Sequence, residues 1–111
     1  MNKLAAVAML LASGIATAAT LGDRASCVSL ADVAADVVDI RDSGVPWDTF
    51  EPWIKNALSV ARAGDTSYVR TQDDADFVLR WFKRIYDTPG STHAQFAAEL
   101  ERECLQRGKK A

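Results

Sequence analysis

Two cysteines restrict the fold of this chain more than any other feature of its sequence. Cys27 and Cys104 are the only cysteines among the 111 residues, so only one intramolecular pairing exists. A bond between them would close most of the chain into one loop and stabilise the folded state by roughly 4 kcal/mol, judged from the chain entropy that such a loop removes. A chain of this length forms one domain with a small core, and such domains often depend on a cross-link. We therefore expect a disulfide between these two residues.

Residues 1–18 have the pattern of a secretory signal peptide. Lys3 supplies a positive charge, a short apolar run follows, and the small residues Ala16 and Ala18 precede the expected cleavage point between Ala18 and Ala19. This arrangement is typical of exported proteins. The alternative, a membrane anchor, would need about twenty apolar residues. We expect a periplasmic or secreted protein that has no membrane span after cleavage and lies in a compartment where paired cysteines are oxidised.

The rest of the chain is predicted to comprise a short N-terminal extension, one helical domain and a flexible basic tail. Apolar residues recur every three or four positions in four stretches, which is the spacing of amphipathic helices. Glycine and proline mark where these stretches end. The predicted segments are an extension at 19–25, a helical domain at 26–107 with helices at 26–42, from 48–52 to 63, 71–86 and from 91 or 92 to 107, a polar loop at 64–70, and a tail at 108–111.

Side chains at the helix starts and on the helix faces predict how the domain is assembled. Ser26 is the expected N-cap of the first helix, and Thr71 with Asp74 has the spacing of a capping box before the third. Cys27 falls on the apolar face of the first helix and Cys104 on that of the fourth. In an antiparallel bundle these two positions lie at the same end. The prediction is an all-α antiparallel bundle of about four helices, stapled by one disulfide between the first and last helices, with the third helix the most buried.

Few side chains have catalytic or metal-binding potential. His93 is the only histidine, and we expect it at a helix start without a catalytic role. Asp32, Asp36 and Asp39 recur on one helix face, which is more typical of a solvated surface than of paired catalytic carboxylates. Cysteine and histidine lack the spacing of a metal site, and there is no glycine-rich phosphate loop. We predict that the protein is not an enzyme and holds no cofactor or metal.

Aromatic residues are the main candidates for a binding surface. Trp47 is predicted to precede the second helix and Trp81 to lie off the central apolar stripe of the third, so either is a candidate for exposure. An exposed tryptophan beside Arg80 and Arg84 would form a patch typical of protein–protein contacts, whereas ordinary core packing is the alternative. The net charge of −2 argues against nucleic acid as a partner, since phosphate binding needs a basic surface.

Four short features together resemble a loose group of small exported bacterial helical proteins. They are Cys27, Ile-Arg-Asp-Ser-Gly-Val-Pro at 40–46, Ile-Tyr-Asp-Thr-Pro at 85–89, and Cys104. Members of that group carry a signal peptide, a helix that stops at an Arg-x-x-Gly-Val-Pro-like segment, an Ile/Val-Tyr-x-x-Pro turn and a late cysteine. The group has no established activity, so the resemblance implies export and a helical fold. Periplasmic acid-stress chaperones are likewise small, helical and stapled once, but no motif of theirs matches here.

These observations favour a protein that acts by non-catalytic contact with another protein whose identity the sequence does not give. Two alternatives remain open. One is a periplasmic stress chaperone, which would expose apolar surface at low pH. The other is an inhibitor or immunity protein against a cell-wall-degrading enzyme, which a neighbouring toxin gene would support.

Overall fold

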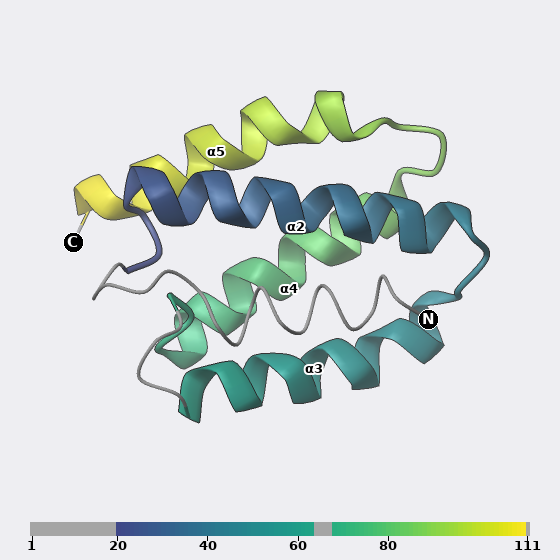
Figure 1. Cartoon of the computed structure of the whole chain (residues 1–111), viewed down its shortest axis with the longest axis horizontal. Helices are drawn as coiled ribbons and strands as arrows, with labels where there is room; N and C mark the ends of the chain where they lie inside the picture. Colours follow the sequence, from purple (N-terminus) through teal and green to yellow (C-terminus); the bar gives the residue numbers. More distant parts are fainter. Residues whose placement is uncertain (1–19, 64–67, 111) are drawn as a thin grey trace.

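Four α-helices form the protein in the computed structural model, which describes residues 20–63 and 68–110 (Figure 1). Successive helices run in opposite directions, so the bundle has the predicted up-down-up-down order. Their bounds are α2 (Arg24–Asp42), α3 (Trp47–Ala63), α4 (Gln72–Asp87) and α5 (His93–Lys110). The predicted all-α class and helix number are confirmed. The expected signal peptide and its cleavage point at Ala18 and Ala19 lie outside the described residues.

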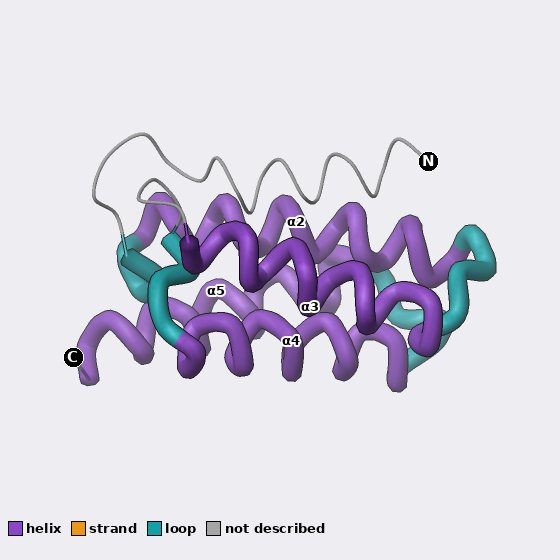
Figure 2. Tube along the Cα trace, turned by 90° about the horizontal axis from the view of Figure 1, so that it is seen from below, coloured by secondary structure: helices purple, strands orange, loops and turns teal. Residues whose placement is uncertain are grey.

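The helices are arranged around two close pairs. α2 packs along α5, α3 packs along α4, and α2 also contacts α4, so that α2 and α4 form the centre of the bundle (Figures 1 and 2). α2 buries nine of its side chains and α4 six, so the prediction that the third helix is the most buried is wrong. Small residues such as Ala31 and Ala34 explain this, because they let α2 lie close to its neighbours and bury more than one stripe.

The start of α2 differs from the prediction. The helix begins at Arg24 and its N-cap position is Asp23, so Ser26 is not the N-cap. The Ser26 side chain is buried, and its hydroxyl donates to the carbonyl oxygens of Thr20 (2.7 Å) and Asp23 (2.9 Å). The carboxylate of Asp23 in turn accepts from the Thr20 N–H (3.0 Å). These bonds tie the residues before α2 into a tight turn.

That turn packs against the end of α5, where the sequence predicted two loose segments. Leu21 is buried, and the backbones of Gly22 and Gly108 approach so closely that a Cβ on either would lie 2.6 Å from an atom of the other. Gly22 also has a φ of +118°, which favours glycine. α5 continues to Lys110, so the expected tail at 108–111 is helical over its described residues. Within residues 20–25, the expected extension belongs to the packed domain.

The connection before α4 confirms one prediction and corrects another. The Thr71 hydroxyl accepts from the Asp74 N–H (3.0 Å), and the Asp74 carboxylate accepts from the Thr71 N–H (3.3 Å), which is the predicted capping box. The preceding segment is not purely polar, because Tyr68 and Val69 are fully buried. Residues 64–67 of the predicted loop lie outside the described part. The sequence did not indicate this burial, because two apolar residues in a short connection show no periodic pattern.

Candidate partner-binding surface

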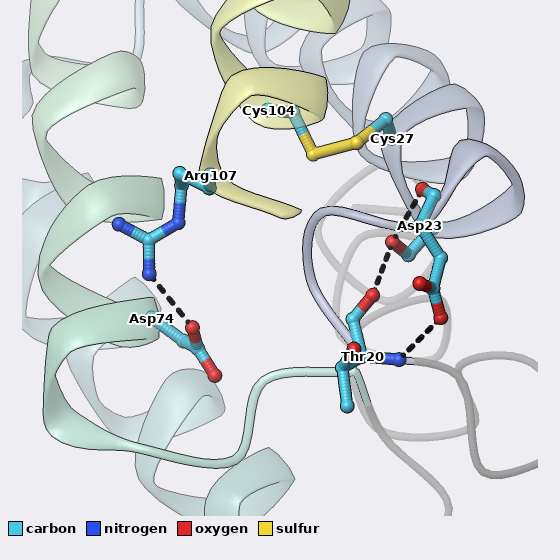
Figure 3. Close-up of a disulfide and its surroundings, with 7 residues drawn as sticks. Thr20, Asp23, Cys27, Asp74, Cys104 and Arg107 are labelled. Atoms are coloured by element: carbon cyan, nitrogen blue, oxygen red, sulfur yellow. Dashed lines mark hydrogen bonds and ion pairs between the residues drawn. A yellow bond between two sulfur atoms is a disulfide. The ribbon is translucent and has the colours of Figure 1, made fainter. Parts of the chain in front are cut away.

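The predicted disulfide is present at one end of the bundle. Cys27 and Cys104 are joined with a Cα–Cα distance of 5.6 Å across a sequence separation of 77, and both side chains are buried (Figure 3). The described chain has no free cysteine. Burial keeps both sulfur atoms away from solvent, so this bond is structural and is not placed to exchange with outside thiols.

Arg107 adds a polar link at the same end. Its guanidinium donates to the Asp74 carboxylate at 2.9 Å (Figure 3). It also donates to the Asp73 carboxylate at 2.9 Å and lies 4.6 Å from the ring centroid of Phe77. Asp74 also belongs to the capping box at the start of α4. The end of α5 is therefore joined to α2 by a covalent bond and to α4 by ion pairs.

The opposite end of the bundle is held by Arg41. Its side chain is 6% exposed, and its guanidinium donates to the carbonyl oxygens of Ile85 (2.9 Å), Thr88 (3.0 Å) and Ser91 (2.7 Å). The end of α2 thus fixes the whole turn between α4 and α5, and we call this set of bonds the Arg41 clamp. The sequence contained both partners, in segments 40–46 and 85–89, but nothing in it indicated that they touch.

Tyr86 reinforces this end. Its hydroxyl donates to the Val45 carbonyl oxygen (2.9 Å), which joins α4 to the turn between α2 and α3. Its ring packs edge-on against Trp47 (5.2 Å) and stacks on Phe50 (5.4 Å). Trp47 is the first residue of α3 and is half-buried, so it does not precede the helix as predicted. The ring contacts with Tyr86 and Phe50 fix the orientation of the Trp47 indole.

Three of the four predicted patch residues, Trp47 among them, lie on one surface. Trp47, Arg80 and Arg84 line a depression between α3 and α4, at the end of the bundle that carries the Arg41 clamp. We call it the Trp47 depression. The sequence analysis missed the other residues of the lining. Leu79 and Lys83 are four positions apart, as Arg80 and Arg84 are, and this helical spacing was the available signal. The complete lining is Trp47, Glu51, Leu79, Arg80, Lys83, Arg84 and Asp87.

Trp81 is not part of this surface, and the idea that it is exposed is wrong. Only 3% of its area is accessible. Its indole N–H donates to a Glu103 carboxylate oxygen (3.1 Å), and its ring meets Phe96 edge-on at 6.5 Å, so it fills the space between α4 and α5. Arg84 lies over the ring at 4.6 Å and shields it from solvent. Trp81 lies off the central apolar stripe of α4, and at this position its side chain faces α5 and not solvent.

Of the three basic residues that line the Trp47 depression, two form ion pairs within the described residues and one does not. Lys83 is paired with Asp87 at 2.8 Å and lies 5.2 Å from the centre of the Trp47 ring. Arg84 is paired with Glu99 on α5 at 2.7 Å. Arg80 is exposed, and within the described residues no ion pair or hydrogen bond of its side chain is found. One guanidinium beside a half-buried indole is therefore left without a carboxylate.

The remaining predicted side chains lie apart from this surface. His93 is half-buried at the start of α5, and its Nε2 lies 3.3 Å from the Ala31 carbonyl oxygen of α2. Asp32 and Asp39 are exposed on α2, and Asp36 is half-buried. Among the described residues, no three His, Cys, Asp or Glu side chains come close enough to hold a metal ion.

Two tyrosines titrate abnormally. Burial raises the pKa of Tyr68 to about 12, and the nearby charge of Asp32 acts in the same direction. The nearby Ser29 hydroxyl lowers the pKa of Tyr68, by less than burial raises it and by more than the Asp32 charge does. Burial also raises the pKa of Tyr86, while the positive charge of Arg41 lowers it.

Neither a membrane-spanning helix among the described residues nor a similar known protein was found. None of the helices in the described part is long and apolar enough to cross a membrane. Searches against protein-family models, curated proteins and solved structures found no match.

Proposed function

We propose that this chain is an exported, periplasmic protein that acts without catalysis by binding another protein through the Trp47 depression. The observation that carries the proposal is the exposed Arg80 guanidinium without an ion pair in the described residues, beside the half-buried indole of Trp47. Tryptophan and arginine are the side chains most enriched at the energetic centres of protein interfaces.

Two further features support this proposal. The buried disulfide fits a protein that folds in an oxidising compartment. Ring contacts with Phe50 and Tyr86 hold the Trp47 indole in place before any partner arrives. A surface held in advance loses less conformational entropy on binding, which favours affinity.

Site-specific photo-crosslinking in cells that export the protein tests this proposal. A photoreactive phenylalanine analogue replaces Lys83 at the edge of the depression, and the matched control places it at Val60, which is 56% exposed on α3 and outside the depression lining. We expect a discrete adduct with one protein from position 83 and none from position 60. Equal labelling from both positions, or no adduct from position 83, would contradict the proposed function.

A further inference from the structure

We propose that the partner contributes an acidic segment, in which an apolar side chain packs on Trp47 and Leu79 and a carboxylate pairs with Arg80. This inference rests on the proposed function and names the chemistry of the partner. It follows from the distribution of charge and apolar surface in the Trp47 depression, taken one group at a time.

The ion pairs already present leave one charge to satisfy. Asp87 neutralises Lys83, and Glu99 neutralises Arg84. Glu51, the other acidic residue of the lining, is 3.4 Å from Lys55. Arg80 remains as the uncompensated cation of this lining. A guanidinium presents a planar fork of donors that matches one carboxylate in a bidentate arrangement.

No residue of the same helix neutralises Arg80. Asp76 lies one turn earlier on α4, at a spacing that suits an ion pair. Its carboxylate accepts from the Gln72 side-chain amide (2.8 Å) and is not paired with Arg80. The guanidinium also lines two adjoining depressions on the α5 side, in which Glu103 is the acidic member. Arg80 is thus placed to reach a ligand that enters from the solvent side of α4.

The apolar part of the depression defines the second requirement. Trp47 and Leu79 are both half-buried, and both line the depression. Lys83 lies over the indole from one side, so a ligand has the remaining ring edge and the Leu79 side chain to cover. An aliphatic or aromatic side chain fits this surface, because its burial is favourable and needs no hydrogen-bond partner.

The rest of the molecule disfavours a polyanion such as nucleic acid. The chain carries a net charge of −2, and Asp32 and Asp39 are exposed on α2. A phosphate backbone needs a run of free cations, whereas this depression offers one. A protein segment with few carboxylates around one apolar side chain satisfies the site and meets less repulsion than a polyanion would.

Peptide titration of the full oxidised protein, followed by NMR, tests this inference. The probe is a short peptide with one Leu flanked on both sides by glutamates, and its matched counterpart carries glutamines in their place. We expect the acidic peptide to bind more tightly and to shift the Trp47 indole and the amides around Arg80. Adding salt should weaken this binding, because the attraction acts between solvent-exposed charges.

Charge-reversal variants locate the contact. Arg80→Glu should weaken binding of the acidic peptide by about tenfold, the effect of losing one charge-assisted pair. Arg24→Glu makes the same charge change at an exposed position on α2 and should leave binding nearly unchanged. Because Arg80 has no ion pair to lose, the circular dichroism of Arg80→Glu should match that of the parent.

Three results would overturn the inference: equal binding of the glutamate and glutamine peptides, equal effects of the two variants, or tighter binding of an oligothymidylate than of the acidic peptide. Such results, together with a crosslink from position 83, would leave the proposed function standing and refute only the acidic partner. Absence of that crosslink would remove the basis of both.

Discussion

The two ends of the bundle are held together by opposite means. At one end a covalent bond joins Cys27 to Cys104, and glycine backbones from the two flanking segments touch. At the other end, Arg41 donates three hydrogen bonds to carbonyl oxygens of the last turn of α4 and of the α4–α5 connection. A disulfide acts chiefly by restricting the unfolded chain. The Arg41 clamp acts in the folded state, because its bonds exist only when the turn and α2 are both in place.

This difference bears on where a binding surface can lie. The Trp47 depression is at the clamped end, and its indole packs against Tyr86, which is bonded to the turn beside the clamp. Hydrogen bonds and aromatic packing fix this surface without the covalent bond. The end with the disulfide contributes stability, and the end with the Arg41 clamp carries the Trp47 depression.

Removal of the disulfide should have the largest effect. Replacing both Cys27 and Cys104 by Ser should cost about 4 kcal/mol of unfolding free energy and lower the melting temperature by more than about 15 °C. Hydrogen exchange should accelerate first at residues 20–27 and 104–110, with the turn at 88–91 keeping its protection. An unchanged melting temperature would refute the importance of the bond, and uniform loss of protection would refute the independence of the two ends.

Removal of the clamp should rank second. Arg41→Met retains most of the apolar stem but removes three hydrogen bonds to carbonyl oxygens, of which those of Ile85 and Thr88 keep a backbone N–H donor, so the loss should be about 2–3 kcal/mol. Arg41→Lys should recover part of this loss, because an ammonium reaches fewer of the three carbonyls. Thermal unfolding followed by circular dichroism measures both variants.

Arg24→Met is the control for the clamp, since that side chain is exposed on the same helix. The Arg41→Met variant should also bind the acidic peptide more weakly, whereas the cysteine double variant should bind it normally below its melting temperature. If both variants lose binding to the same extent, the ends are not independent.

The buried phenol of Tyr68 should make the protein sensitive to alkali. Its pKa is about 12 in the folded state and about 10 when unfolded, so the neutral form favours folding. This contribution is fully present below pH 10 and is lost as pH rises from 10 towards 12, by about 2–3 kcal/mol in all. Tyr68→Phe should lose less stability over that range and should be close to neutral at pH 7. Urea unfolding at several pH values would show it, and parallel pH curves for the two proteins would contradict it.

The glycine contact should give the smallest effect. A Cβ at Gly108 would lie 2.6 Å from the Gly22 carbonyl oxygen, so the backbones must move apart in Gly108→Ala. Overpacking costs roughly 1–3 kcal/mol, and alanine returns about 1 kcal/mol of helix propensity, which leaves a net loss of about 1 kcal/mol. Gly90→Ala is an informative comparison, since open space surrounds that position and only its φ of +90° opposes the change. A stabilised Gly108→Ala variant would show that the N-terminal turn is not packed against α5.

The sequence predicted the helices because they depend on the short-range spacing of apolar residues. It predicted the cysteine pairing because two cysteines allow only one intramolecular bond. Three features escaped it. Tyr68 sits in a short connection with no period, and the contact of Gly108 with Gly22 depends on two segments meeting in space. Arg41 looked like an ordinary charged residue at a helix end, since carbonyl partners more than forty positions away leave no mark on the sequence. For the proposed binding surface, the sequence pointed to Trp47, Arg80 and Arg84 but could not tell which way Trp81 faces.

The disulfide also makes the described domain behave almost as a closed ring. Because 77 positions separate the two cysteines, all three turns between helices lie inside the loop that the bond closes. A single peptide-bond cut in the turn after α4 would therefore leave two pieces still attached, free to re-form the same bundle. A force applied to the two chain ends would pass through the sulfur–sulfur bond, so the chain between Cys27 and Cys104 would carry no load. The chain thus tolerates both nicking and pulling for the same topological reason.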